Sequence, residues 1–319
     1  AALVPQGRTR RLLHLGRAVG EMAAGAAAEG VARLARGEAA ELSQLMLTPA
    51  NARRLAERLS QMRGAVMKVG QLMSMDGHGL LPPQFAELLG GLRDRAHVMP
   101  ATQLIEVLER EYGSGWHARF RRFSFEPVAA ASIGQVHRAE TPDGRVLALK
   151  IQYPGVRQSI DSDVANLGLL ARLPTPGPAR PDPTPMLERI RMQLHRETDY
   201  AAEAASLTAY REALGDDPVL TVPQVQADYC TATILATDFA PGIAIDRLAD
   251  PAQPRVHRDH VAAALTRLSV REFFEMRLVQ TDPNFGNYLF DADSGRIALI
   301  DFGATEVVSP RLVEQLRSL

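Results

Sequence analysis

The feature that most constrains this chain lies near its C-terminal end, where an apolar run stops at an acidic residue. Residues 297–300 read Ile-Ala-Leu-Ile, and Asp301 follows them as the first residue of an Asp-Phe-Gly tripeptide. Asn287 stands fourteen residues before Asp301, and Asp282 stands five positions before Asn287. A carboxylate at the end of a strand, followed by a flexible glycine, can hold Mg²⁺ against nucleotide phosphates. A polar turn between a helix and a hairpin is the alternative explanation for the Asp282 segment.

The spacing of the two polar residues before the tripeptide is that of a kinase catalytic loop. In kinases, this Asp-x₄-Asn spacing places a base-like Asp near the phosphoryl acceptor and an Asn on the second metal ion. Asp282 is therefore expected to position the attacking water or hydroxyl, and Asn287 and Asp301 are expected to hold Mg²⁺. The His-Arg pair that usually precedes this Asp is absent, and Gln280-Thr281 stands in its place.

Lysine is nearly absent from the chain. It occurs only at Lys68 and Lys150, and the other 34 of the 36 basic residues are arginine. A position that keeps lysine under such a bias is one that needs a compact, flexible ammonium group rather than a planar guanidinium. Lys150 ends an apolar run fourteen residues after Val136, which is the spacing of the kinase lysine that contacts the α- and β-phosphates. Two surface lysines retained by chance are the alternative explanation.

The segment before Lys150 resembles a kinase phosphate loop in which alanine replaces glycine. Ala129, Ala131 and Gly134 stand where a kinase carries three glycines. Because a left-handed conformation costs alanine roughly 1–2 kcal/mol, this loop should cradle phosphates differently and alter which nucleotide is preferred. The loop residues assigned to nucleotide binding are Ala129, Ala130, Ala131, Ser132, Gly134 and Val136.

An acidic helical segment follows, and it offers a partner for Lys150. Glu203 is the expected partner that holds the ammonium group of Lys150 in place. Glu197 and Asp199 form a second acidic pair on the same segment. A helix face that carries solvated charges is the alternative explanation for this cluster.

The other lysine lies in a strongly periodic helical segment. Apolar residues recur at intervals of three and four over residues 51–75, which predicts a helix, and Lys68 and Gln71 share one face of it. Gly70 costs about 1 kcal/mol in a helix interior, so it indicates close packing against a neighbour. A core helix with one exposed lysine is the alternative, and the rarity of lysine argues against it.

The remaining pattern predicts strands with one inserted helix, followed by a mostly helical part. Short apolar runs over residues 126–151, with a turn at residues 142–144, predict a hairpin, and residues 219–239 predict two more strands. Helices are expected over residues 101–112, 186–213 and 256–278, and short strands are expected on either side of residues 291–295. This order is the layout of a protein-kinase-like α+β fold.

Composition excludes several classes of protein. The 319 residues are 46% hydrophobic and 23% charged, as in soluble globular proteins, and the net charge of −1 provides no basic field for nucleic acid. A single cysteine, Cys230, rules out a disulfide framework and a cysteine-rich metal site. No apolar run approaches the roughly 18–20 residues that span a bilayer. Residues 1–45 could form an amphipathic helix on a membrane or a partner, with a packed surface helix as the alternative.

Taken together, these motifs resemble the UbiB family of atypical kinase-like proteins, the aarF-domain kinases linked to coenzyme Q biosynthesis. The resemblance runs from about residue 55 to residue 305. It is carried by Lys68-Val69-Gly70-Gln71 as the family's KxGQ motif, residues 129–136 as its Ala-rich loop, Lys150, Glu197-x-Asp199 with Glu203, residues 282–287, and Asp301-Phe302-Gly303.

The resemblance implies a protein-kinase-like, two-lobed α+β fold with an N-terminal helical KxGQ extension and a short C-lobe. The expected parts are an amphipathic helical segment (1–50), the helical KxGQ extension (51–125), an N-lobe with the Ala-rich loop (126–240) and a partial helical C-lobe with the catalytic loop and tripeptide (241–319). In this family the KxGQ helices fold over the site where an ordinary kinase would bind a peptide substrate. Lys68 and Gln71 then point into the nucleotide site beside Glu197 and Asp199.

The resemblance also implies an ATPase that associates with lipid and membrane, rather than a protein kinase that acts on other proteins. ATP or ADP and Mg²⁺ are the expected ligands. The expected partners are phenolic isoprenoid lipid precursors, the membrane surface, coenzyme Q biosynthesis enzymes and a second copy of the chain as a homodimer, with no nucleic acid. The expected location is the cytoplasmic side of an inner membrane by peripheral attachment, or the matrix side in mitochondria.

Three hypotheses follow. The first is Mg²⁺-dependent ATP hydrolysis that supports the handling of lipid precursors in coenzyme Q biosynthesis, with adenine received by backbone groups of Thr237, Asp238 and Phe239. The second is phosphoryl transfer to a small-molecule or lipid hydroxyl. The third is a non-catalytic scaffold that nucleotide binding controls. A phosphorylated lipid product would distinguish the second, and nucleotide binding with negligible turnover would distinguish the third.

Overall fold

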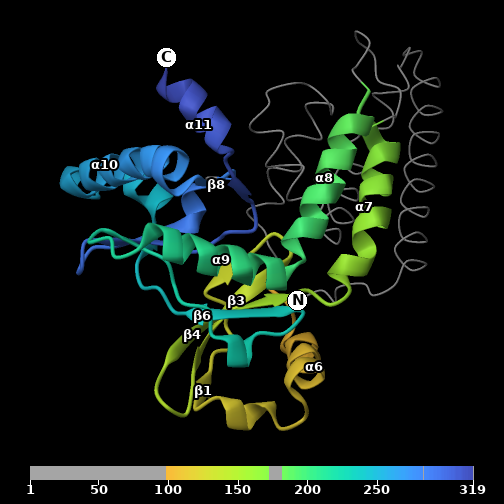
Figure 1. Cartoon of the computed structure of the whole chain (residues 1–319). Coiled ribbons are helices and arrows are strands. Elements are labelled where there is room, and N and C mark those ends of the chain that lie inside the picture. Colours follow the sequence, from red (N-terminus) through yellow and green to blue (C-terminus); the bar gives the residue numbers. More distant parts are fainter. Residues whose placement is uncertain (1–97, 172–181, 283, 319) are drawn as a thin grey trace, which may run out of the picture. The chain divides into compact units, whose positions relative to one another are not determined.

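The computed structural model describes residues 98–171, 182–282 and 284–318 (Figure 1). The predicted helix over residues 51–75, the segment 1–45, and Lys68 and Gln71 lie outside the described residues. The chain divides into two compact units. The described parts of the first unit are residues 98–107, 129–135, 152–171 and 182–198, and those of the second are residues 108–128, 136–151, 199–282 and 284–318.

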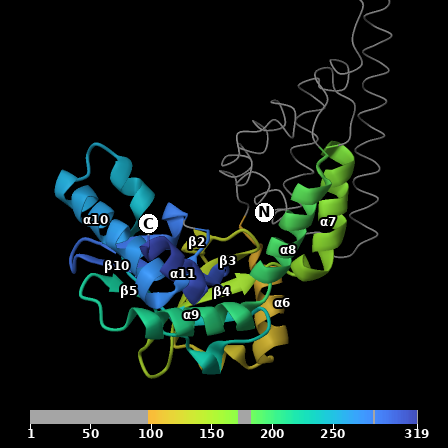
Figure 2. The same ribbon diagram turned by 45° about the horizontal axis from the view of Figure 1, so that its top comes forward.

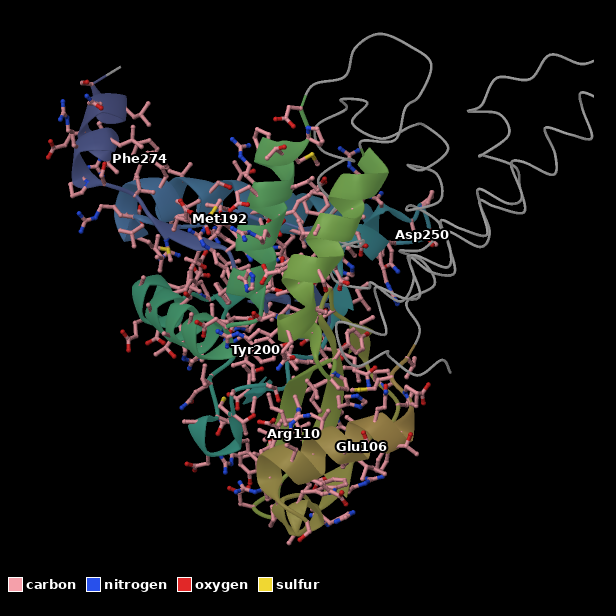
Figure 3. All side chains as sticks on the ribbon, turned by 90° about the vertical axis from the view of Figure 1, so that its right-hand side faces the viewer. Glu106, Arg110, Met192, Tyr200, Asp250 and Phe274 are labelled. Carbon is pink, nitrogen blue, oxygen red and sulfur yellow. The ribbon has the colours of Figure 1, made fainter. Side chains whose placement is uncertain are left out.

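The first unit is built on two helices that lie side by side, α7 (Val156–Ala171) and α8 (Thr184–Glu197) (Figures 1 and 2). Two pairs of side chains are buried, Ile160 and Val164 of α7 and Ile190 and Leu194 of α8, and the members of each pair are four residues apart. Met192, labelled in Figure 3, lies on the exposed side of α8. Helix α7 was not among the predicted elements.

The predicted hairpin over residues 126–151 is confirmed. Strands β3 (Gly134–Glu140) and β4 (Val146–Gln152) are neighbours in a five-stranded sheet of order β1-β3-β4-β6, in which β2 also pairs with β3. The other strands are β1 (Arg122–Phe123), β2 (Ala129–Ala130) and β6 (Ile234–Asp238). The turn closes through a 2.9 Å hydrogen bond from the Thr141 N–H to the Arg145 carbonyl. Gly144 has φ +90° there, which glycine adopts without steric cost.

The helix predicted over residues 101–112 is confirmed as α6 (Ala101–Tyr112). The helix predicted over residues 186–213 is instead two helices, α8 and α9 (Tyr200–Leu214). The break falls at Asp199, whose carboxylate accepts a 3.0 Å hydrogen bond from the Ala202 N–H and so caps α9. An N-cap residue lies outside the helical conformation, so one continuous helix cannot run through Asp199.

The second unit also contains a four-stranded sheet of order β5-β10-β9-β7, in which β10 runs parallel to β5 and antiparallel to β9. Its strands are β5 (Leu220–Thr221), β7 (Ile243–Ala244), β9 (Tyr288–Asp291) and β10 (Arg296–Leu299). A two-stranded sheet pairs β8 (Leu278–Gln280) with β11 (Thr305–Val307). Strands β9 and β10 are the pair predicted on either side of residues 291–295.

The long helix predicted to residue 278 ends earlier. Helix α10 (Arg255–Arg271) passes into a π-helical turn, η5 (Glu272–Met276), and Arg277 then adopts a left-handed conformation with φ 53°. The remaining elements are α11 (Pro310–Arg317) and the 3₁₀ turns η2 (Trp116–Arg119), η3 (Ala227–Tyr229), η4 (Ile245–Ala249) and η6 (Phe285–Asn287).

The core of the second unit forms between α9, α10 and the β5-β10-β9-β7 sheet. Figure 2 labels α9, α10, β5 and β10. Tyr210, Leu268, Ile297, Leu299 and Phe302 are among its buried members. Because Phe302 is buried in this core, Asp301 is held close to the end of strand β10. None of the helices in the described residues is both long and apolar enough to cross a membrane.

Candidate functional site

The centre of the candidate site is the ammonium group of Lys150 on β4. Leu149 and Ile151 beside it are fully buried on the other face of the strand. Lys150 Nζ lies 2.7 Å from Glu203 Oε1 and 3.3 Å from Asp301 Oδ2. The side chains of Lys150 and Glu203 are only 17% and 2% exposed, so this ion pair is largely shielded from water. The pair joins strand β4 to helix α9 within the second unit.

The two carboxylates keep Lys150 charged. Burial alone would lower the pKa of the Lys150 ammonium, because it removes water from the charged form. The negative charges of Asp301 and Glu203 outweigh that effect and raise the pKa well above its usual value of 10.5. An ammonium that is charged at neutral pH and has one partly exposed carboxylate neighbour is suited to bind an anionic ligand such as a phosphate.

A tyrosine ring completes the surroundings of the ammonium group, and the sequence motifs did not identify it. Lys150 Nζ lies 5.4 Å from the centre of the Tyr200 ring, within the range of a cation–π interaction. Tyr200, labelled at the start of α9 in Figure 3, is 2% exposed. It precedes Glu203 by three residues and therefore shares its helix face, which is the signal that could have revealed it.

The two predicted metal ligands lie at adjacent ends of the β9–β10 hairpin. Leu299 pairs with Tyr288, and the Ile300 N–H donates a 3.0 Å hydrogen bond to the Asn287 carbonyl. Pairing of these strands therefore brings Asn287 beside the residue that precedes Asp301. Asp301 Oδ1 accepts a 3.0 Å hydrogen bond from the Gly303 N–H, and its side chain is 38% exposed.

This donor set fits the way in which proteins bind Mg²⁺ together with a nucleotide. Mg²⁺ usually takes one or two carboxylates and completes its shell with water and substrate phosphates. Asp301 supplies an accessible carboxylate, and Asn287 supplies an amide oxygen from the neighbouring strand end. The described residues contain no group of three or more His, Cys, Asp or Glu side chains that could hold a metal ion by themselves.

The loop that carries Asp282 is tied to the segment after the tripeptide. The Thr281 N–H and hydroxyl both donate to the Ala304 carbonyl, at 2.7 and 2.8 Å. Asp282 itself is half-buried, and its carbonyl accepts a 2.8 Å hydrogen bond from the Asn284 N–H. The Thr281 bonds hold the main chain before Asp282 next to Ala304, and the Asn284 bond closes a turn directly after Asp282.

The Ala-rich loop and Glu197 meet within the first unit. The Ser132 hydroxyl donates a 2.5 Å hydrogen bond to Glu197 Oε2 at the end of α8. The loop closes through a 2.9 Å bond from the Ala131 N–H to the Gly134 carbonyl. Among the described residues, Arg277 is the only residue other than glycine with positive φ, and Gly134 is not among the glycines that have it. The alanines at 129–131 are therefore accommodated without left-handed strain.

The residues expected to receive adenine lie at the end of β6. Thr237 pairs with Ala148 of β4, and the N–H groups of Asp238 and Phe239 donate 2.9 Å hydrogen bonds to the Gln224 and Val146 carbonyls. We call residues 237–241 the linker. Adenine could bind there only through backbone groups other than the Asp238 and Phe239 N–H groups, unless it displaced the Gln224 and Val146 carbonyls from them. Asp199 makes the helix-capping contact described above.

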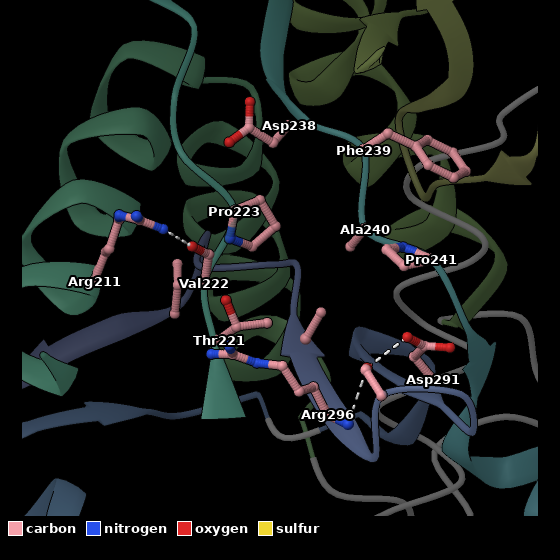
Figure 4. A pocket seen from close by; sticks show the side chains of 12 residues that line it. Arg211, Thr221, Val222, Pro223, Asp238, Phe239, Ala240, Pro241, Asp291 and Arg296 are labelled. Carbon is pink, nitrogen blue, oxygen red and sulfur yellow. Dashed lines mark hydrogen bonds between the residues drawn. The ribbon is translucent and has the colours of Figure 1, made fainter. Parts of the chain in front are cut away.

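A cavity of about 270 Å³ opens beside this linker (Figure 4). Its lining residues are Arg211, Thr221, Val222, Pro223, Asp238, Phe239, Ala240, Pro241, Asp291, Ser294, Arg296 and Ala298. Neither Lys150, Glu203 nor Asp301 is among them, so the cavity is separate from the ion cluster. Its two arginines donate to backbone carbonyls, Arg211 to Val222 and Arg296 to Asp217 and Leu220.

Residues 91–319 match the ABC1 atypical kinase-like domain. The mitochondrial atypical kinase COQ8B of Rattus norvegicus is 38% identical over 95% of this chain and 57% of that protein. The mitochondrial atypical kinase COQ8 of Saccharomyces cerevisiae is 35% identical over 99% of this chain and 63% of that protein. The chain thus spans less than two thirds of the length of these relatives.

A solved structure of Rv3197 in complex with erythromycin, from Mycobacterium tuberculosis, matches with a TM-score of 0.56. It is 30% identical in sequence, and the match covers 81% of this chain and 65% of that one. The α+β class and the kinase-like fold expected from the sequence are confirmed by these matches. The chain therefore belongs to the UbiB family of atypical kinase-like proteins, whose common module is the ABC1 domain.

Proposed function

We propose that this chain binds Mg²⁺-ATP or ADP at the Lys150 cluster and hydrolyses ATP in support of coenzyme Q biosynthesis. The observation that carries the proposal is the buried ammonium of Lys150, held 2.7 Å from Glu203 and 3.3 Å from Asp301. Glu203 fixes the Lys150 cation, and Asp301 remains accessible as a second carboxylate beside it. Kinases use this arrangement to position phosphates and their metal ion.

Each residue of the cluster has a distinct task in this proposal. Glu203 holds the Lys150 ammonium, which binds oxygens of the α- and β-phosphates. Asp301 and Asn287 would hold Mg²⁺, which supplies charge neutralisation at the transferred phosphoryl group. Asp282 positions the attacking water and accepts its proton. Since positioning and electrostatics supply most of the catalysis in phosphoryl transfer, the hydrogen bonds that tie Thr281 to Ala304 support this role.

The wider role rests on the resemblance to the family and on the relatives. We propose phenolic isoprenoid precursors, coenzyme Q biosynthesis enzymes and a second copy of the chain as partners. The proposed location is the surface of an inner membrane, reached from the cytoplasm or, in mitochondria, from the matrix. The two relatives named above are mitochondrial atypical kinases. We place Lys68, Gln71, Glu197 and Asp199 beside the nucleotide, as the family motif implies.

ATP turnover with and without liposomes and a ubiquinone-precursor phenol tests this function. We expect Mg²⁺-dependent release of inorganic phosphate that rises when both additions are present. Labelled ATP identifies where the phosphoryl group goes. Label in a lipid or phenol product would establish a phosphotransferase instead, and nucleotide binding with no turnover under any condition would establish a scaffold.

Replacing Ala131 by glycine is expected to change nucleotide preference. Glycine widens the conformations open to the loop between Ala129 and Gly134, so its N–H groups can approach phosphates differently. The ratio of the ATP and ADP dissociation constants, measured by calorimetry, should shift by severalfold or more, corresponding to roughly 1 kcal/mol. Ala118→Gly, in an exposed 3₁₀ turn, is the matched control. An unchanged ratio in Ala131→Gly would contradict the assignment of the loop.

A further inference from the structure

A buried carboxyl group on the π-helical turn takes no part in the site described above. Glu272 is 7% exposed. Its Oε1 accepts a 2.7 Å hydrogen bond from the Tyr210 hydroxyl of α9 and a 3.1 Å bond from the Gln280 N–H of β8. Burial raises the pKa of Glu272, although the bonds from Tyr210 and Gln280 oppose that rise. Two buried donors thus converge on one oxygen in the interior of the second unit.

The second of these donors belongs to a residue whose side chain reaches the tripeptide. Gln280 is 5% exposed, and its Nε2 donates a hydrogen bond to the Asp301 carbonyl. Its Oε1 accepts a 2.7 Å bond from the Tyr288 hydroxyl, which turns the amide so that the N–H side faces Asp301. The main chain and both side-chain groups of Gln280 are therefore engaged.

The local backbone explains how Gln280 reaches this position. The helix that begins at Arg255 widens into the π turn at Glu272–Met276, and Arg277 closes it with its N–H bonded to the Glu272 carbonyl. π turns and left-handed residues other than glycine are uncommon and recur at functional sites. Because the π turn ends at Met276 and Arg277 is left-handed, strand β8 begins at Leu278. The strand places the Gln280 N–H beside the carboxylate of Glu272, which lies eight residues earlier in the sequence.

The tripeptide is braced on its other side as well. The ring of Phe302 packs against that of Tyr210, with centroids 4.7 Å apart. Tyr210 thus contacts both the residue after Asp301 and the carboxyl group that holds Gln280. Tyr210 of α9, Glu272 of the π turn and Tyr288 of β9 are thus all connected to Gln280 of β8. Gln280 in turn donates to the Asp301 carbonyl.

We propose that Gln280, held by Glu272 and oriented by Tyr288, is a positioning residue that fixes the main chain of Asp301 so that its carboxylate faces Lys150 and the metal ion. This inference rests on the proposed function, because it assigns a role to Gln280 in the same site. Gln280 stands where ordinary kinases have the histidine of the catalytic loop, and it makes its contact through an amide that does not titrate.

Gln280→Leu and a pair of variants at Glu272 test the proposal. Gln280→Leu should lower kcat by roughly tenfold at every pH and raise the Mg²⁺ concentration needed for half-maximal turnover. Glu272→Gln keeps the acceptor oxygen and should retain activity, whereas Glu272→Leu should lose it. Unchanged kcat and Mg²⁺ dependence in Gln280→Leu, or equal losses in Glu272→Gln and Glu272→Leu, would overturn the proposal.

Hydrogen exchange supplies a readout that does not depend on turnover. The amides of residues 301–304 should exchange faster in Gln280→Leu and Glu272→Leu than in the wild type. Arg258→Met is the matched control, because it removes bonds to the Leu248, Asp250 and Gln253 carbonyls without touching the tripeptide. If the wild type shows no turnover, the proposed function fails, while faster exchange limited to the Gln280 and Glu272 variants would still support the positioning role. Equal exchange in all variants would overturn it.

Discussion

Replacing either partner of the Lys150–Glu203 pair alone should destabilise the second unit strongly, and replacing both should not. Glu203 is 3% exposed, so Lys150→Met leaves a buried carboxylate without the ammonium that lies 2.7 Å away. Removing one partner of a buried pair typically costs about 3–5 kcal/mol, whereas an apolar replacement of both is often neutral or stabilising. Glu203→Leu should cost less than Lys150→Met, because Asp301 still neutralises the lysine at 3.3 Å.

Urea denaturation of the two single variants and of Lys150→Met/Glu203→Leu measures this effect. We expect the double variant to unfold within about 1.5 kcal/mol of the wild type. Arg255→Gln is the control, because its ion pair with Asp259 is largely exposed and should contribute little. Single and double variants that are equally destabilised would show that the pair is not a coupled unit.

The same pair gives stability a predictable pH dependence. The pKa of Lys150 is raised on folding, so its contribution to the unfolding free energy is fully present below the usual value of 10.5 and is lost as pH rises through the folded-state value. In urea denaturation, the unfolding free energy of the wild type should therefore exceed that of Lys150→Met by a constant amount from pH 7 to pH 10. This difference should shrink only in stronger alkali.

Asp301→Asn should abolish Mg²⁺-dependent ATP hydrolysis and leave the fold intact. The asparagine can still accept the Gly303 N–H through its amide oxygen, and its side chain stays at a partly exposed position. What it lacks is the negative charge that the proposed metal site and Lys150 require. Loss of one such electrostatic group typically lowers kcat by roughly 10²–10³.

Phosphate release at saturating Mg²⁺, together with the thermal midpoint, measures the effect of Asp301→Asn. The midpoint should stay near that of the wild type while turnover falls to the background. Asp259→Asn, which removes an exposed carboxylate of α10, should leave both unchanged. Hydrolysis that survives in purified Asp301→Asn would show that the metal assignment is wrong.

Elements that depend on local chemistry could be predicted from the sequence. The turn at residues 142–144 and helix α6 were predicted, because turn residues and apolar spacing act over a few residues. The break between α8 and α9 was not predicted, although Asp199 is a favourable N-cap residue, because no glycine or proline interrupts the chain there. The spacing of Ile160, Val164 and Leu167 also carries the signal of α7.

The end of α10 shows where such prediction stops. Nothing in residues 272–277 signals a π turn or a left-handed arginine, because tertiary contacts impose both. The contact from Gln280 to the Asp301 carbonyl likewise depends on pairing of β8 with β11 and β9 with β10, segments that local propensity cannot align. The pairing of Lys150 with Glu203 could be proposed only because two motif spacings coincide.

Calorimetric titration of Mg²⁺-ADP into the wild type and into Lys150→Met/Glu203→Leu tests the central claim most directly. The double variant is expected to keep its fold while losing the ammonium group, so a difference in affinity reports on the site and not on stability. We expect one saturable site in the wild type and binding weaker by roughly 10- to 100-fold in the double variant, the value of a charge-assisted contact to phosphate. Equal affinity in the two proteins, or no binding by the wild type, would contradict the account.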